Sequence, residues 1–149
     1  MEQYKRILIA VDLSSESEQV LHKARHFAGE SVVSHLVYVQ EPMDNVYVGI
    51  VPQSAAYGGL GELEAQLRNE YQQKLNDLGE KYAIAPDHRH MLNGAPAREI
   101  HQFAKDKDIE LIVIGTHGQK GLQLLLGSTA NSVLHGAQCD VLSVRIASK

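Results

Sequence analysis

The sequence predicts a single α/β domain in which a parallel sheet carries helices on both faces. Short apolar runs rich in branched residues alternate with amphipathic stretches along all 149 residues. Continuous apolar runs of this length are typical of strands buried on both faces, as parallel strands are. Regular alternation of strand and helix is the pattern of a doubly wound sheet. We therefore expect one domain over residues 1–149, with five strands in the order 3-2-1-4-5.

The first half of the chain begins with an apolar run at residues 7–11 that ends at Asp12. Ser15 and Glu18 have the spacing of a capping box and predict the start of the first helix. Five apolar residues of that helix are expected to face the sheet: Val20, Leu21, Ala24, Phe27 and Ala28. A second strand is expected at residues 36–39. The following segment, residues 41–61, lacks a period and is interpreted as a functional loop.

The second half begins with a long helix expected over residues 60–82. Its apolar stripe comprises Leu63, Leu67, Tyr71, Leu75, Leu78 and Tyr82. Residues 87–92 read as a polar edge strand, and the turn at residues 93–96 places Pro96 near the start of a helix. That helix should bury Ile100, Phe103 and Ala104. A buried strand at residues 111–114, a helix opening at Ser128 and a last strand at residues 141–144 complete the pattern. The last helix should bury Ala130, Val133, Leu134 and Ala137.

Composition narrows the class of protein. The formal net charge is −4, which argues against general nucleic-acid binding because phosphate neutralisation needs clustered Lys and Arg. The single cysteine, Cys139, excludes an internal disulfide and a CxxC metal site, and we expect it at the boundary of the core. No apolar stretch approaches the ~18 residues of a membrane span, and residues 7–11 are too short for a signal-peptide core. We expect a cytoplasmic protein without a membrane contact.

A glycine-rich loop, residues 115–128, joins the buried strand at 111–114 to the last helix. Glycine lets backbone N–H groups approach a phosphate closely, and a helix amino terminus attracts the negative charge. Ser128 and Thr129 add hydroxyl groups at that terminus. The loop matches neither the Walker pattern nor the GxGxxG fingerprint. The alternative interpretation is a sharp turn whose Ser128 only caps the helix.

Asp12 and this loop are expected to lie together. In a sheet of order 3-2-1-4-5 the first and fourth strands flank the point where the winding reverses, which is where ligands bind. Asp12 is then placed to accept a hydrogen bond from a ribose or a base. The alternative is that Asp12 serves only the turn into the first helix.

The sequence resembles the universal stress protein family. The resemblance is carried by residues 7–14, by residues 94–100 and by the stretch from the glycine loop through Cys139-Asp140-Val141-Leu142 to Val144. It implies a five-stranded parallel sheet, a role in stress survival and a homodimer formed by antiparallel pairing of the C-terminal edge strand. It also implies ATP as the ligand, since the ATP-binding branch carries Gly-x2-Gly-x9-Gly-[Ser/Thr].

The resemblance assigns roles residue by residue. Asp12 corresponds to the acid on the ribose or adenine side, while Ala10 and Val39 correspond to backbone and wall contacts to adenine. The phosphate and ribose loop corresponds to Gly115, His117, Gly118, Gly127, Ser128 and Thr129. The sequence departs from the ATP-binding pattern at one point: eight residues, not nine, separate Gly118 from Gly127.

Three functions remain open on these grounds. The leading one is a dimeric, nucleotide-responsive stress protein without fast chemistry, in which no residue is catalytic. The second is a stress-induced interaction protein that binds no nucleotide, which the shorter spacing favours. The third is a slow ATP hydrolase, for which Asp12 is the sole visible acid.

Five histidines have candidate roles in ligand or metal binding. His117 is expected to contact a ligand from the loop rather than to act as a base. The pairs His22 with His26, and His88 with His90, have spacings seen in metal sites but no third ligand. We expect them to lie on exposed faces, and we expect no metal.

Overall fold

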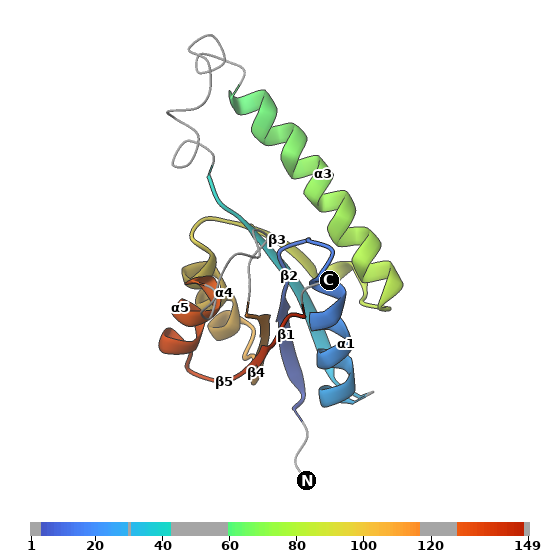
Figure 1. Ribbon diagram of the computed structural model, residues 1–149, viewed down its shortest axis with the longest axis vertical. Helices are drawn as coiled ribbons and strands as arrows, with labels where there is room; N and C mark the ends of the chain where they lie inside the picture. The colour runs from blue at the N-terminus through green and yellow to red at the C-terminus, as the bar shows by residue number, and fades with distance from the viewer. Residues whose placement is uncertain (1–3, 30, 43–59, 117–127, 148–149) are drawn as a thin grey trace.

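The computed structural model describes residues 4–29, 31–42, 60–116 and 128–147. Within them lies one five-stranded sheet with the order β3-β2-β1-β4-β5, and every pair of neighbouring strands is parallel. The elements in chain order are β1 (Arg6–Ala10), α1 (Ser17–Ala28), β2 (Val33–Gln40), α3 (Leu60–Lys81), the 3-10 turn η2 (Pro86–His88), β3 (Arg89–Asn93), α4 (Pro96–Asp106), β4 (Leu111–Gly115), α5 (Ser128–Gly136) and β5 (Asp140–Val144). The predicted fold class and strand order are confirmed (Figure 1).

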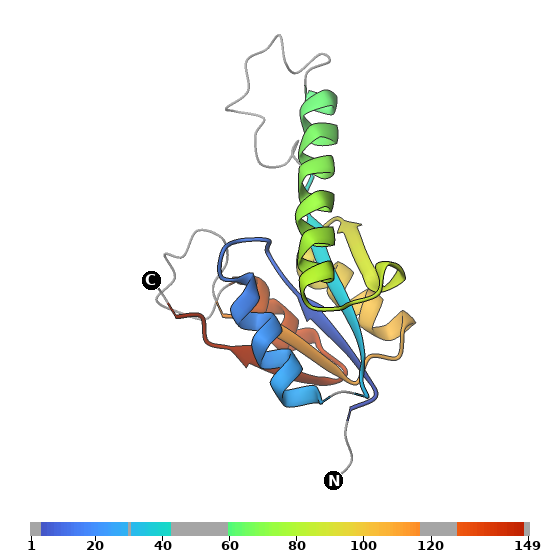
Figure 2. The ribbon, with the colours of Figure 1, turned by 90° about the vertical axis from the view of Figure 1, so that its right-hand side faces the viewer.

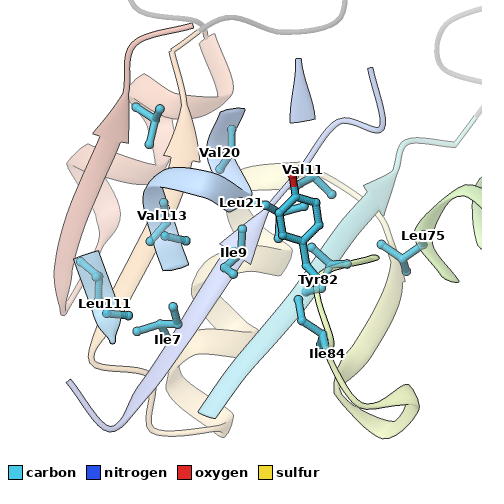
Figure 3. Close-up of a cluster of buried hydrophobic side chains, with 14 of the residues drawn as sticks. Ile7, Ile9, Val11, Val20, Leu21, Leu75, Tyr82, Ile84, Leu111 and Val113 are labelled. Carbon is cyan, nitrogen blue, oxygen red and sulfur yellow. The ribbon is translucent and has the colours of Figure 1, made fainter. Parts of the chain in front are cut away.

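One face of the sheet packs against α1 and α3. Alternate side chains of the strands point to this face because successive residues of a strand face opposite ways. Val20 and Leu21 of α1 meet Ile9 and Val113 at the centre, and Leu75 of α3 packs beside β2 (Figure 3). Burial of each such side chain stabilises the fold by roughly 1.5–3 kcal/mol.

The opposite face packs against α4 and α5. Ile100 and Phe103 of α4 and Val133 of α5 cover Leu8 and Ile112 of the two central strands. β1 and β4 are therefore buried on both faces, which is why their sequences are continuously apolar rather than alternating.

Only the C-terminal half of α3 packs on the sheet. Leu75 is fully buried, whereas Leu63, three turns earlier, is 38% exposed. Figures 1 and 2 both show the first half of the helix extending beyond the sheet edge. The apolar stripe expected along the whole helix is therefore buried only toward its C-terminal end.

The predicted capping box is wrong. α1 begins at Ser17, and Glu16 precedes it without a side-chain cap. The turn is instead organised by Asp12, whose carboxylate accepts hydrogen bonds from Ser14 and Ser17. At the start of the helix the Ser17 amide donates to the Ser14 carbonyl at 3.1 Å and the Gln19 amide donates to the Glu16 carbonyl at 3.0 Å.

Two residues expected on inner helix faces are exposed. Phe27 of α1 is 55% exposed and lies beside the ring of Tyr4, and Leu134 of α5 is 48% exposed. Each follows a buried position of its helix, Ala24 and Val133, and so sits at the margin of the apolar stripe.

The remaining elements match the expectations. β3 is an edge strand, Pro96 is the first residue of α4, and Ile100, Phe103 and Ala104 are buried. Cys139 is half-buried against the α4–α5 core, as expected of a boundary residue. Among the described segments, no helix combines the length and apolarity needed to cross a membrane.

Candidate functional site

The candidate site lies where β1 and β4 end side by side. Ala10 pairs with Val37 on one side and with Ile114 on the other, so Asp12 and Gly115 leave the same edge of the sheet. The chain from β1 goes to α1 on one face, and α5, which follows β4 in chain order, packs on the other face. This divergence is the switch point at which ligands bind in doubly wound sheets.

Asp12 uses one carboxylate oxygen to hold the turn after β1. Its Oδ1 accepts from the Ser14 amide at 3.0 Å, the Ser14 hydroxyl at 2.6 Å and the Ser17 hydroxyl at 3.1 Å. Within the described part of the chain, no donor is directed at Oδ2. Ser17 is buried, so the contact also satisfies a hydroxyl that would be costly to leave unpaired. The two interpretations of Asp12, turn residue and ligand contact, are therefore compatible.

Sequence reasoning treated Tyr38 and Tyr71 only as packing residues, yet Tyr38 lies near Asp12. The two rings contact each other in a tilted arrangement, with centroids 5.1 Å apart, and join β2 to α3. Burial, followed by the proximity of Tyr71 and Asp12, raises the pKa of Tyr38 far above its usual range. Tyr38 therefore stays a neutral hydroxyl beside the Asp12 carboxylate. The alternation of β2 could have located it, since Tyr38 faces away from Val39.

Gln40 is a second residue that sequence reasoning missed. It ends β2, its side chain is buried, and its Oε1 has no hydrogen-bond partner among the residues that the structure describes. A buried acceptor without a partner costs free energy, so its position at the carboxyl edge of the sheet is consistent with a polar ligand nearby.

Ala10 and Val39 both belong to the face covered by α4 and α5. Ala10 is buried, and Val39 packs against the same core from β2. Their side chains are therefore committed to the core, while their backbone lies at the edge where Asp12 begins.

Gly115 has a packing role of its own. A Cβ placed there would lie 3.1 Å from Ile146 and 3.3 Å from Val20, which is too tight without a shift. Next to it, Thr116 extends the β4–β5 pairing: its amide donates to the Val144 carbonyl at 2.9 Å, and its Oγ1 accepts from the Ile146 amide at 3.3 Å.

The structure describes two of the other predicted loop residues, Ser128 and Thr129. Ser128 opens α5 as predicted, and Thr129 follows it half-buried, so both stand at a helix amino terminus. His117, Gly118 and Gly127 lie outside the described residues. In the described ranges, no three or more His, Cys, Asp or Glu side chains are grouped to hold a metal ion.

The prediction that His88 and His90 lie on an exposed face is wrong. Both are half-buried and pack against His35 of β2, with ring centroids 4.7 and 5.2 Å from it. We expected the face of the sheet that carries these histidines to be open to solvent, but α4 covers it. His22 and His26, by contrast, are exposed as expected.

Comparison with known proteins identifies the family to which the chain belongs. The family model described as "Universal stress protein family" matches residues 3–145. The chain is 37% identical to universal stress protein A homolog 2 of Coxiella burnetii, over 98% of both chains. The chain therefore belongs to the universal stress protein family, and the predicted resemblance is confirmed.

Solved structures agree on the architecture. The hypothetical protein MJ0577, whose structure was determined to assign its biochemical function, superposes with a TM-score of 0.80 at 22% identity, covering 99% of this chain and 100% of that one. A universal stress protein in complex with cAMP superposes with a TM-score of 0.59 at 21% identity, covering 98% of this chain and 100% of that one. At these identities the likeness is one of fold.

Proposed function

We propose that this protein binds an adenine nucleotide where β1 and β4 end, and that nucleotide occupancy regulates a cytoplasmic stress response. The observation that carries the proposal is the pairing of a switch point with Asp12, whose Oδ2 receives no donor from the described residues. The cAMP complex of a protein with this fold supports an adenine nucleotide as the ligand class.

The roles follow from position. Asp12 Oδ2 accepts from a ribose hydroxyl or the base, and the backbone at Ala10 and Val39 borders the adenine. The phosphates lie against the loop residues Gly115, His117, Gly118, Gly127, Ser128 and Thr129, with the α5 amino terminus supplying a favourable dipole. No described residue is arranged as a base for hydrolysis, so we propose a binding protein rather than an enzyme.

The test separates the turn role of Asp12 from its ligand role. In Asp12→Asn the amide oxygen still accepts from Ser14 and Ser17, while an NH2 group replaces the free oxygen. Calorimetry with ATP, cAMP and GTP should show adenine-nucleotide binding by the wild type and about tenfold weaker binding by Asp12→Asn, the loss of one charge-assisted hydrogen bond. Thermal stability without ligand should be unchanged in Asp12→Asn and lowered in Asp12→Ala.

The control is Asp77→Asn, an exposed carboxylate on α3 that bonds only Gln73 in the described structure and should bind like the wild type. Absence of both heat and thermal stabilisation at millimolar adenine nucleotide would refute the proposal.

One observation favours a second function, an interaction protein that binds no nucleotide: the eight-residue spacing between Gly118 and Gly127. One residue spans up to ~3.5 Å, while hydrogen bonds tolerate a few tenths of an ångström. If this function is the correct one, the wild type shows no nucleotide binding by calorimetry, and inserting a ninth residue between these glycines creates nucleotide binding.

A further inference from the structure

Three histidines from separate elements form one cluster on the α4 face of the sheet. His35 of β2 lies between His88 of η2 and His90 of β3, and we call this set the three-histidine cluster. His35 is only 8% exposed, although Val37 and Val39, which share its face of β2, are apolar. Phe103 of α4 closes the cluster, with centroids 5.4 Å from His35 and 4.7 Å from His90.

A direct hydrogen bond joins two of these rings. His35 Nδ1 and His90 Nε2 are 3.1 Å apart, so one nitrogen donates and the other accepts. This contact holds one proton between the two nitrogens. When both rings are protonated, both nitrogens carry hydrogen and the bond is lost.

The surroundings disfavour positive charge. Burial is the largest cause that lowers the pKa of both His35 and His90, and the nearby His88 and Lys107, at the end of α4, lower both further by repulsion. On β1 the residue paired with His35 is the apolar Leu8, and the Arg6 guanidinium on the same strand donates to the Asp108 carbonyl at 3.0 Å. Asp87 of η2 is the acid that acts on the cluster, and it is exposed.

β3 is an edge strand, and among the described strands its one backbone partner is β2, so side-chain contacts contribute much to holding it in place. On its other face Arg89 anchors it, with Nε donating to the Ile84 carbonyl at 2.9 Å and Nη2 pairing with Glu80 at 3.1 Å. The Glu80 carboxylate is exposed, so the ion pair adds little. Buried contacts therefore hold β3 on both faces: Arg89 and Met91 lie on the α3 face, and the histidines lie on the α4 face.

We propose that the three-histidine cluster is an acid-sensitive joint, which holds η2 and β3 against β2 at neutral pH and releases them when the surroundings become acidic. This role needs no nucleotide and stands apart from the site at the ends of β1 and β4. Through this cluster, a stress protein changes its structure directly when the pH falls.

The direction follows from proton linkage. Burial lowers the pKa of His35 to about 4 and lowers that of His90, whereas an exposed histidine titrates near 6.5. Between these values the open form binds more protons than the closed form, so a falling pH favours opening. His35 alone raises the opening equilibrium about tenfold between about pH 7.5 and about pH 5.5, and His90 adds to this.

The experiment is hydrogen exchange by mass spectrometry on the full chain at about pH 7.5 and about pH 5.5, corrected for intrinsic rates. We expect protection of residues 86–93 to fall at least about tenfold more than that of β4, the central strand. In a His35→Gln/His90→Gln variant this difference should disappear, and in His26→Gln, an exposed histidine of α1, it should persist.

Two results would overturn the proposal. One is equal protection of residues 86–93 at both pH values in the wild type. The other is a zinc-induced rise in Tm at about pH 7.5 that His90→Gln abolishes, which would make the cluster a metal site instead. If the double variant does not fold, an NMR titration of the wild type decides: His35 and His90 must titrate well below the 6.5 of an unperturbed histidine, and midpoints near 6.5 for both contradict the joint.

Discussion

Asp12 illustrates how one carboxylate can serve structure with one oxygen and remain open for a ligand with the other. Ser14 and Ser17 supply three donors, all to Oδ1. This fixes the orientation of the side chain, so Oδ2 points in one direction without losing entropy on binding.

At the same scale, Cys139 is expected to be an unreactive thiol. Burial, and after it the nearby Asp140 carboxylate, raises the pKa of the Cys139 thiol above its usual range. The thiolate is the nucleophile, so the native protein should react with iodoacetamide at about pH 8 at least about tenfold more slowly than the unfolded chain in urea. Mass spectrometry over time measures both rates. Equal rates would show that the thiol is open to solvent and ionised normally.

At the scale of elements, α3 contains a matched pair of glycines. A Cβ at Gly79 would collide with the Arg89 side chain, which bonds Ile84 and Glu80 and is almost fully buried. At Gly61, in the exposed first turns of the same helix, a Cβ meets nothing within 4 Å.

Gly79→Ala should therefore lower the free energy of unfolding by about 1–3 kcal/mol, because Arg89 must leave its buried hydrogen bond. Gly61→Ala should leave stability unchanged or raise it by up to about 1 kcal/mol through helix propensity. Urea denaturation measures both. A stabilising effect at Gly79 would mean that Arg89 moves away freely and does not anchor β3.

At the scale of the molecule, the strand order decides where function can lie. β1 and β4 adjoin although about a hundred residues separate them in sequence, and this adjacency creates the switch point. The same order leaves β3 and β5 as the two edges. One edge carries the three-histidine cluster, and the other remains available to a second copy.

We expect homodimerisation through β5, by antiparallel pairing of its unpaired edge. Ser143 is exposed within this strand, so Ser143→Lys places two cations close together across a two-fold axis. Sedimentation velocity over a concentration series should show a dimer for the wild type and at least about tenfold weaker association for Ser143→Lys. Ser31→Lys, exposed before β2, is the control. A wild type that stays monomeric, or a Ser143→Lys variant that associates as tightly, contradicts this interface.

Local pattern was enough for the strands and for the helix faces near the sheet centre. Residues 7–10 and 111–114 are continuously apolar because both faces of their strands are covered, and that requirement is visible in the chain itself. Pro96 marks the start of α4 because its missing N–H suits a first helical turn. The adjacency of β1 and β4, which places Asp12 and Gly115 at the same edge, was expected from the order 3-2-1-4-5, one of the few orders that alternation and handedness allow.

What the sequence by itself determined about this protein is the α/β class, the strand order and the family. Only the tertiary structure decided which residues of the apolar stripes are buried against the sheet. Phe27 and Leu134 lie at the margins of their stripes and are exposed, and the first half of α3 extends beyond the sheet. It also turned His35, His88 and His90 from separate polar residues into one buried cluster. The physical reason is that the periodicity of a segment shows only which of its side chains face the core. How far that core extends, and which side chains lie beside them there, depends on residues far away in the chain.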